Sequence, residues 1–176
     1  VLKRLDQAIE DHDRIYGVIT GISGAGSDII PGETNLNPKR SKALYAQSLK
    51  NALKTSKTAF KDLGLYETAA TGIKADNETE TNVLNTFCLK NSHKARCHVS
   101  ATSAVIGNTR VVSGLFSVIK TALCLNHDLL PANKKITPAN EKLNADYFSF
   151  TDTPVHWKRQ PGKPIRKACA ASITMD

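Results

Sequence analysis

The stretch SAVIGNTRVVSGLFSVIKTALCLNHDLLP occupies residues 103–131 and contains a long apolar segment. Its composition predicts a loop with Gly107 and Asn108 near the tip, then a helix over residues 111–125 with Thr109 as the N-cap. Apolar residues fall on nearly every face of this helix, which is typical of a helix buried inside a larger domain. At about 16 residues it is too short to span a membrane. Because helix N-termini favour anions and oxyanions, the preceding loop is a good position for a catalytic or binding site.

The length of 176 residues and the hydrophobic content of 40% are those of one ordinary domain. The chain begins at Val1 and its single methionine is Met175, so we expect a piece of a longer protein. The first residues predict a charged amphipathic helix and not a signal peptide. The four cysteines are irregularly spaced in apolar segments, which favours reduced thiols and a cytoplasmic location.

The net charge of +8 raises the question of nucleic-acid binding. The basic residues are dispersed along the chain, however, and no RNA-binding or zinc motif accompanies them. A diffuse positive surface suits an acidic protein partner at least as well. We therefore do not expect nucleic acid as a partner.

Hydrophobic periodicity and turn residues divide the chain into alternating elements. The predicted helices lie at residues 1–11, 39–57, 77–89 and 111–125. The predicted strands lie at residues 14–22, 63–68, 98–101 and 165–173. Strands that alternate with helices in this way predict an α/β layered fold.

Four segments together resemble the C-terminal half of a β-ketoacyl synthase of the thiolase fold. The IGNT loop followed by SVIKTALCLNHDLLP resembles the family's K-S-N-I-G-H-T loop and the helix SGxxxxIKTALxLxxxxxP. YETAATGIKADNETE, at residues 66–80, resembles VEAHGTGT-x-x-GDPIE. The opening VLKRLDQAIEDHDRIYGVI matches the start of the family's second half, and KPIRKACAASI matches its RRAGVSSF strand. The resemblance implies that residues 1–176 form the second half of a thiolase-like fold, with a mixed sheet flanked by helices.

A condensing enzyme of this family uses a nucleophilic cysteine, two histidines and a lysine. The resemblance places the family's first histidine at Ala69, its lysine at Ser103 and its second histidine at Asn108. A methyl group cannot hold a proton, and an amide has no proton-transfer role near neutral pH. Ala70 and Ile73 further replace a glycine and a threonine of the first loop. The nucleophile belongs to the family's first half, and its place is not taken by any cysteine of this chain (Cys88, Cys97, Cys124 and Cys169). We therefore expect no catalytic residue here.

This pattern resembles the chain-length factors, the non-catalytic partners of active ketosynthases. The resemblance implies a component of a polyunsaturated fatty acid or polyketide synthase, with the former preferred, that helps to shape an acyl tunnel. It implies an active ketosynthase as partner in a pseudo-symmetric dimer, an acyl carrier domain, and phosphopantetheine-linked acyl substrates without a bound cofactor. Because one half cannot cover both faces of such a sheet, we expect the isolated chain to expose apolar surface and to associate with its missing first half, and through that with the active ketosynthase. Two alternatives stay open: an active acyltransferase that uses residues outside this chain, and a scaffold module without acyl chemistry.

The remaining candidates have simpler explanations. A zinc site at Cys88 and Cys97-His98 would lack a fourth ligand, and Gly24 and Gly26 alone are a weak phosphate motif. The loop at Asn108 is either a surviving binding loop or a structural one, and the basic loop at residues 158–167 either docks a carrier domain or is only solvated. The histidines are expected at the surface or at helix ends: His12, His93, His98, His127 and His156.

Overall fold

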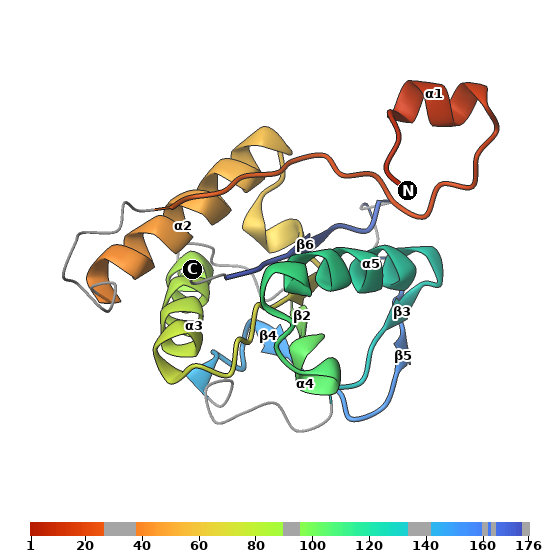
Figure 1. The fold of residues 1–176 in the computed structure, drawn as a ribbon. Coiled ribbons are helices and arrows are strands. Elements are labelled where there is room, and N and C mark those ends of the chain that lie inside the picture. The colour runs from red at the N-terminus through yellow and green to blue at the C-terminus, as the bar shows by residue number, and fades with distance from the viewer. Residues whose placement is uncertain (27–37, 90–95, 134–141, 160–161, 163–164, 174–176) are drawn as a thin grey trace.

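A computed structural model describes residues 1–26, 38–89, 96–133, 142–159, 162 and 165–173 (Figure 1). Helices and strands alternate along much of the chain, as the periodicity predicts. The helices are α1 (Leu5–Glu10), α2 (Pro38–Thr55), η1 (Phe60–Asp62), α3 (Lys74–Leu89), α4 (Ser103–Ile106), η2 (Arg110–Val112) and α5 (Ser113–Asn126). The strands are β1 (Leu65–Glu67), β2 (Cys97–Ser100), β3 (Leu129–Leu130), β4 (Phe148–Ser149), β5 (Val155–His156) and β6 (Ala168–Ala170).

The main sheet has the strand order β4-β2-β1-β6, and each neighbouring pair is parallel. Tyr66 of β1 is opposite Val99 of β2 on one side and Cys169 of β6 on the other. Antiparallel pairing among the described strands is confined to a short ribbon of β3 and β5. The predicted α/β fold is therefore confirmed.

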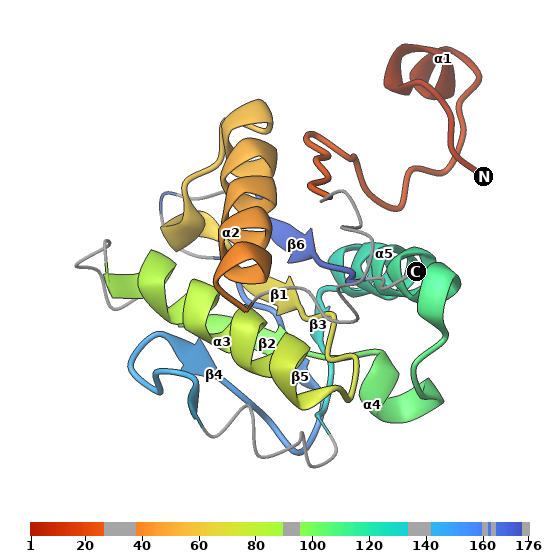
Figure 2. The same ribbon diagram turned by 60° about the vertical axis from the view of Figure 1, so that its left-hand side comes forward.

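Helices cover the sheet from both sides, with α2 and α3 on one face and α5 on the other (Figure 2). Neighbouring side chains of a strand point to opposite faces, so Tyr66 packs with the α2–α3 layer while Leu65 packs near α5. The α2–α3 layer forms the larger core, which includes Leu49, Phe60, Leu63, Val83, Leu84, Cys88, Val99 and Phe148. The smaller cluster on the α5 side contains Leu65, Cys124 and Trp157.

The two central helices confirm the amphipathic reading of the sequence. Helix α2 buries Leu49 and carries Lys50 and Lys54 on its exposed side. Helix α3 begins at Lys74, a few residues before the predicted start. Glu80 therefore lies in its second turn.

Residues 14–22 are not a strand, although their β-branched composition predicts one. The segment runs as an extended strand-like chain past α5 and α2, but no backbone ladder joins it to the sheet. A Cβ built on Gly21 would lie 2.6 Å from the carbonyl oxygen of Ala52 in α2, so the backbones touch closely there. Composition thus predicts the extended backbone but not its hydrogen-bonding partner.

Helix α5 is the main correction to the sequence analysis. It begins at Ser113, and Thr109 makes no side-chain cap hydrogen bond. Within this chain the helix is buried on one face only, which is formed by Ser117, Thr121 and Cys124. Its large apolar side chains are largely exposed: Leu115, Phe116, Ile119 and Leu123. The expected exposed apolar surface is therefore present. Within the described residues, no helix combines the length and apolar character that a bilayer crossing requires.

His98 is also placed differently from the prediction, because it lies inside the protein with only 1% of its surface exposed. Its Nε2 atom is 2.9 Å from the carbonyl oxygen of Pro131, and burial lowers its pKa. His12, His127 and His156 are exposed, with His127 directly after the last residue of α5, while His93 lies outside the described residues. Gly24 and Gly26 are exposed, and the residues that follow Gly26 lie outside the described part of the chain.

Candidate functional site

The candidate site lies where β1 and β2 end. The carboxyl ends of parallel strands are the usual place for ligand sites in α/β sheets, because the following loops meet there. The loop after β1 covers residues 68–73, and the segment after β2 covers residues 101–109 and includes α4. We call these the first and the second site loop.

The structure brings the three positions Ala69, Ser103 and Asn108 together across the two site loops. The Oγ atom of Ser103 donates to the carbonyl oxygens of Ala70 at 2.7 Å and of Ala69 at 3.3 Å. The Nδ2 group of Asn108 donates to the carbonyl oxygen of Thr71 at 2.8 Å, and its Oδ1 atom accepts from the backbone N–H of Arg110 at 2.8 Å. These side chains therefore join one loop to the other.

The backbone of the first site loop has an unusual conformation. Ala70 has a φ angle of 38°, in the left-handed region that a side chain disfavours, and the next left-handed residue is Gly72 at 84°. The Oγ1 atom of Thr71 donates to Asp76 at 2.9 Å and accepts from the backbone N–H of Ile73 at 3.2 Å. The bonds from the second site loop thus hold a conformation that alanine alone would not favour.

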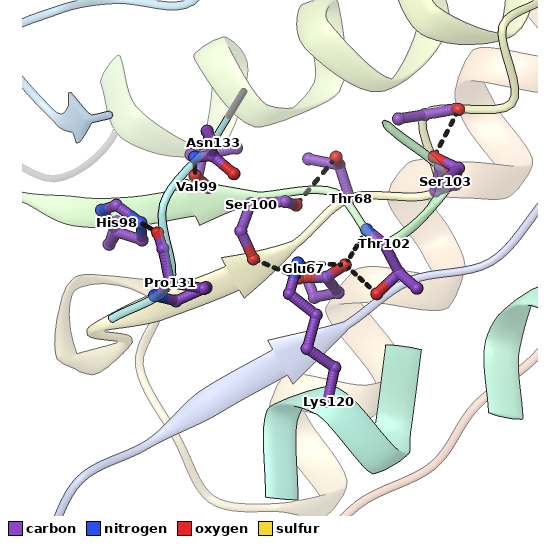
Figure 3. A network of polar contacts seen from close by, with 12 residues as sticks. Glu67, Thr68, His98, Val99, Ser100, Thr102, Ser103, Lys120, Pro131 and Asn133 are labelled. Carbon is purple, nitrogen blue, oxygen red and sulfur yellow. Dashed lines mark hydrogen bonds and ion pairs between the residues drawn. The ribbon is translucent and has the colours of Figure 1, made fainter. Parts of the chain in front are cut away.

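Glu67 is a fully buried carboxylate at the end of β1, on the α5 side of the sheet (Figure 3). It accepts hydrogen bonds from the Oγ atom of Ser100 and from both the backbone N–H and the Oγ1 atom of Thr102, the last at 2.6 Å. The Nζ atom of Lys120 in α5 lies 3.0 Å from its Oε2 atom and 3.2 Å from Oε1. Its charge is therefore compensated by a cation and by several donors, as burial of a carboxylate requires.

Glu80 is the second buried carboxylate, on the other side of the first site loop. Its Oε1 atom accepts from Tyr45 at 2.5 Å and from the backbone N–H of Ala69 at 3.0 Å, and Oε2 accepts from the N–H of Ala70 at 3.3 Å. The Tyr45 hydroxyl is 2.8 Å from that of Tyr66. Loss of solvation raises the pKa of Glu80, and the hydrogen bonds from Tyr45 and the loop oppose this shift only in part.

We expect the Glu80→Gln variant to become more stable relative to the wild type as the pH rises. A raised folded-state pKa means that Glu80 contributes its full stability below the ordinary value of 4.5 and loses it as the pH rises through the folded-state value. The glutamine does not titrate. Urea unfolding of both proteins at several pH values above 4.5 measures the difference between their free energies of unfolding. Glu78→Gln, a change on the more exposed part of the same helix, is the control, and a difference that is constant with pH would contradict the prediction.

The chain is similar to known proteins over most of its length. Residues 16–137 match the family described as "Beta-ketoacyl synthase, C-terminal domain". The chain belongs to this family. It is 32% identical over 188 residues to "Polyketide synthase PksL" of Bacillus subtilis (strain 168), a match that covers 98% of this chain and 4% of that protein. The chain thus spans a small part of the relative's length.

Solved ketosynthases have the same fold. The "Ketosynthase from module 6 of the bacillaene synthase from Bacillus subtilis 168" superposes with a TM-score of 0.76 and 28% identity, covering 96% of this chain and 30% of that one. "Ketosynthase twelve from bacillaene polyketide synthase in Bacillus amyloliquefaciens" gives a TM-score of 0.77 at 20% identity, over 97% of this chain and 30% of that one. The thiolase-like β-ketoacyl synthase fold expected from the sequence is therefore confirmed.

The cysteines of this β-ketoacyl synthase domain have the character of core residues, and all four are free. Burial raises the pKa of Cys88 and of Cys169 to about 12 and also raises those of Cys97 and Cys124. A thiol with a raised pKa is a poor nucleophile at neutral pH. Cys97 and Cys88 lie in the α2–α3 core, whereas the His98 ring contacts Pro131 on the α5 side, so these residues do not converge on a zinc ion.

Sequence analysis did not single out the polar residues that hold the β-ketoacyl synthase site loops in place. Glu67 follows two apolar residues in a strand, and Lys120 is the one charged residue of α5. A charge in an otherwise apolar segment indicates a buried partner, and this signal is present in the sequence. The partner's identity is not, because Glu67 and Lys120 are 53 residues apart.

Proposed function

We propose that this chain is a non-catalytic, chain-length-factor-like component of a polyketide or fatty acid synthase. The observation that carries the proposal is the use made of the three expected catalytic positions. Ser103 and Asn108 direct hydrogen-bond donors at backbone carbonyls of the first site loop, and Ala69 offers only a methyl group. A condensing site needs a proton carrier and donors aimed at a developing oxyanion. Side chains that bind the protein's own backbone do not serve that purpose.

An active ketosynthase is the partner that this proposal requires. The exposed apolar side chains of α5 support association, since proteins rarely leave such a patch uncovered. We expect the first half of the family's fold, which lies outside this chain, to cover the patch, and the ketosynthase to bind through that half. Leu115, Ile119 and Leu123 also line an open hollow of about 2690 Å³, whose other walls include residues 14–22, α2 and β6. A surface of this kind can form one wall of a tunnel for an acyl chain once a partner covers it.

An acyl carrier domain is the second proposed partner. Arg166 is not available to it, because its guanidinium group lies 2.5 Å from Asp128 and donates to the carbonyl oxygen of Trp157 at 2.7 Å. Lys158 and Arg159 are exposed next to this pair. They are the described basic residues of the 158–167 loop that an acidic carrier surface would contact first.

The double variant Lys158→Glu/Arg159→Glu is expected to weaken binding of an acidic acyl carrier domain by roughly tenfold at low salt, because it reverses two charges at the proposed contact. The dissociation constant, measured at two ionic strengths, tests this. Lys50→Glu/Lys54→Glu, which makes the same charge change on α2, is the matched control. Equal weakening by both variants would indicate a net-charge effect and not a docking site.

The alternative function is that of an active condensing enzyme. It is favoured by the chain's similarity to polyketide synthases and ketosynthases. Relatives and solved structures that are similar to this chain carry the names of polyketide synthases and ketosynthases. These names favour a polyketide synthase as the assembly to which the chain belongs. A polyunsaturated fatty acid synthase is the alternative assembly.

Enlarging the exposed face of α5 tests the tunnel role. With Leu115→Phe or Ile119→Phe, the assembly of this protein and an active ketosynthase should release shorter acyl products, because the aromatic ring takes up more of the tunnel volume than the aliphatic side chain that it replaces. Val155→Phe on the β3–β5 ribbon is the control, since Val155 is partly exposed and does not line the hollow. Products of unchanged length in both α5 variants would favour a scaffold without acyl chemistry.

A further inference from the structure

The ion pair of the buried Glu67 and the half-buried Lys120 joins more parts of the site than any one of the three expected catalytic positions does. Glu67 ends β1, Ser100 ends β2, Thr102 opens the second site loop and Lys120 belongs to α5. All of these segments meet at one carboxylate (Figure 3).

The hydrogen bonds of this carboxylate are directed at the bases of the loops. Thr102 uses both its backbone N–H and its hydroxyl on Oε1, which fixes the first turn of the second site loop. Thr68, the first residue after Glu67, donates its backbone N–H and its hydroxyl to the carbonyl oxygen of Ser100, at 2.8 and 3.1 Å. The two loops are therefore joined at their bases around Glu67, while Ser103 and Asn108 join them further out.

Lys120 supplies the charge that makes this arrangement stable. Its ammonium group contacts both carboxylate oxygens, and its side chain is 23% exposed whereas that of Glu67 is 0% exposed. A carboxylate so deeply buried would be strongly unfavourable if its cation were removed. Because Lys120 is on α5, the pair also fixes the loops relative to the exposed apolar helix.

We propose that Glu67 and Lys120 are positioning residues that hold the two site loops in register with each other and with α5. They would do this in a catalytic and in a non-catalytic ketosynthase alike, so their test is separate from that of the proposed function. The face that meets a partner is ordered by this pair before the partner binds.

Amide hydrogen exchange on the purified full chain tests this proposal. Lys120→Met removes the cation, and we expect amides of residues 68–73 and 101–109 to exchange at least about tenfold faster, while those of α2 and α3 change by less than about twofold. In the double variant Glu67→Gln/Lys120→Met, much of the protection should return, because no buried charge is left without a partner. Glu78→Gln and Lys142→Met, which separate an exposed ion pair of 3.2 Å, are the controls.

The proposal is overturned if the loops keep their protection in Lys120→Met, if all segments lose it by one common factor, or if the double variant recovers none of it. A common factor would indicate a general loss of stability without a positioning role. If Lys120→Met does not fold, Thr102→Val decides, since it keeps both charges and removes one donor to Glu67. It should accelerate exchange in residues 101–109 about threefold to tenfold, and an unchanged rate there would equally overturn the proposal.

Discussion

The double variant Leu115→Asp/Ile119→Asp is expected to lose association with the first half of the fold, and through it with an active ketosynthase, by at least about a hundredfold in affinity. The two side chains are 55% and 47% exposed in this chain, so a charge is tolerated until a partner must cover it. Burial of an unpaired carboxylate at an interface is strongly unfavourable.

The stability of the chain itself should fall by only about 1 kcal/mol or less, chiefly because aspartate is a poorer helix former than leucine. Affinity and urea unfolding are measured on the same preparations. Leu129→Asp/Val155→Asp on the ribbon, with exposures of 37% and 36%, is the matched control. Retained affinity in the α5 variant, or the same loss in the ribbon variant, would contradict the proposed interface.

The Leu84→Ala variant is expected to lose about 2 to 5 kcal/mol of unfolding free energy, because Leu84 is fully buried between α3 and the sheet. Leu89→Ala, at the exposed end of the same helix, should change stability by only about 0.5 kcal/mol. Urea unfolding of both variants measures this contrast. Comparable losses at the two positions would mean that the α2–α3 core is not packed as described.

The sheet and the helices α2 and α3 could be predicted from the sequence because their patterns are local. Helix α3 places Val83, Leu84 and Cys88 at helical spacing, and the short strands β1 and β2 are marked by β-branched and aromatic residues between polar loops. The family motifs add the layered thiolase-like arrangement, which no local pattern contains.

The exposure of α5 could not be predicted in the same way. Apolar content indicates that a helix is buried by something, but it does not say whether the cover comes from the same chain. The buried face of α5 instead carries Ser117, Thr121 and the charged neighbour Lys120, since it lies over the polar network at Glu67. The same limit applies to residues 14–22, whose extended backbone finds no strand partner among the described residues.

Ala69, Ser103 and Asn108, the three positions that the family motifs single out, lie on two loops that hydrogen bonds join. The motifs do not predict which groups these side chains bind. Ser103 and Asn108 bind backbone carbonyls of the facing loop, and the two buried carboxylates obtain their partners from residues ten or more positions away. Such contacts follow from tertiary packing and not from spacing along the chain.

The most direct test of the non-catalytic role is a malonyl decarboxylation and condensation assay on the complete protein without an active partner. The substrate is a malonyl group on an acyl carrier domain, and both release of carbon dioxide and formation of a β-ketoacyl product are measured. We expect neither rate to exceed that of the carrier domain alone. Turnover by the unpartnered protein would contradict the proposed role and identify it as an active condensing enzyme.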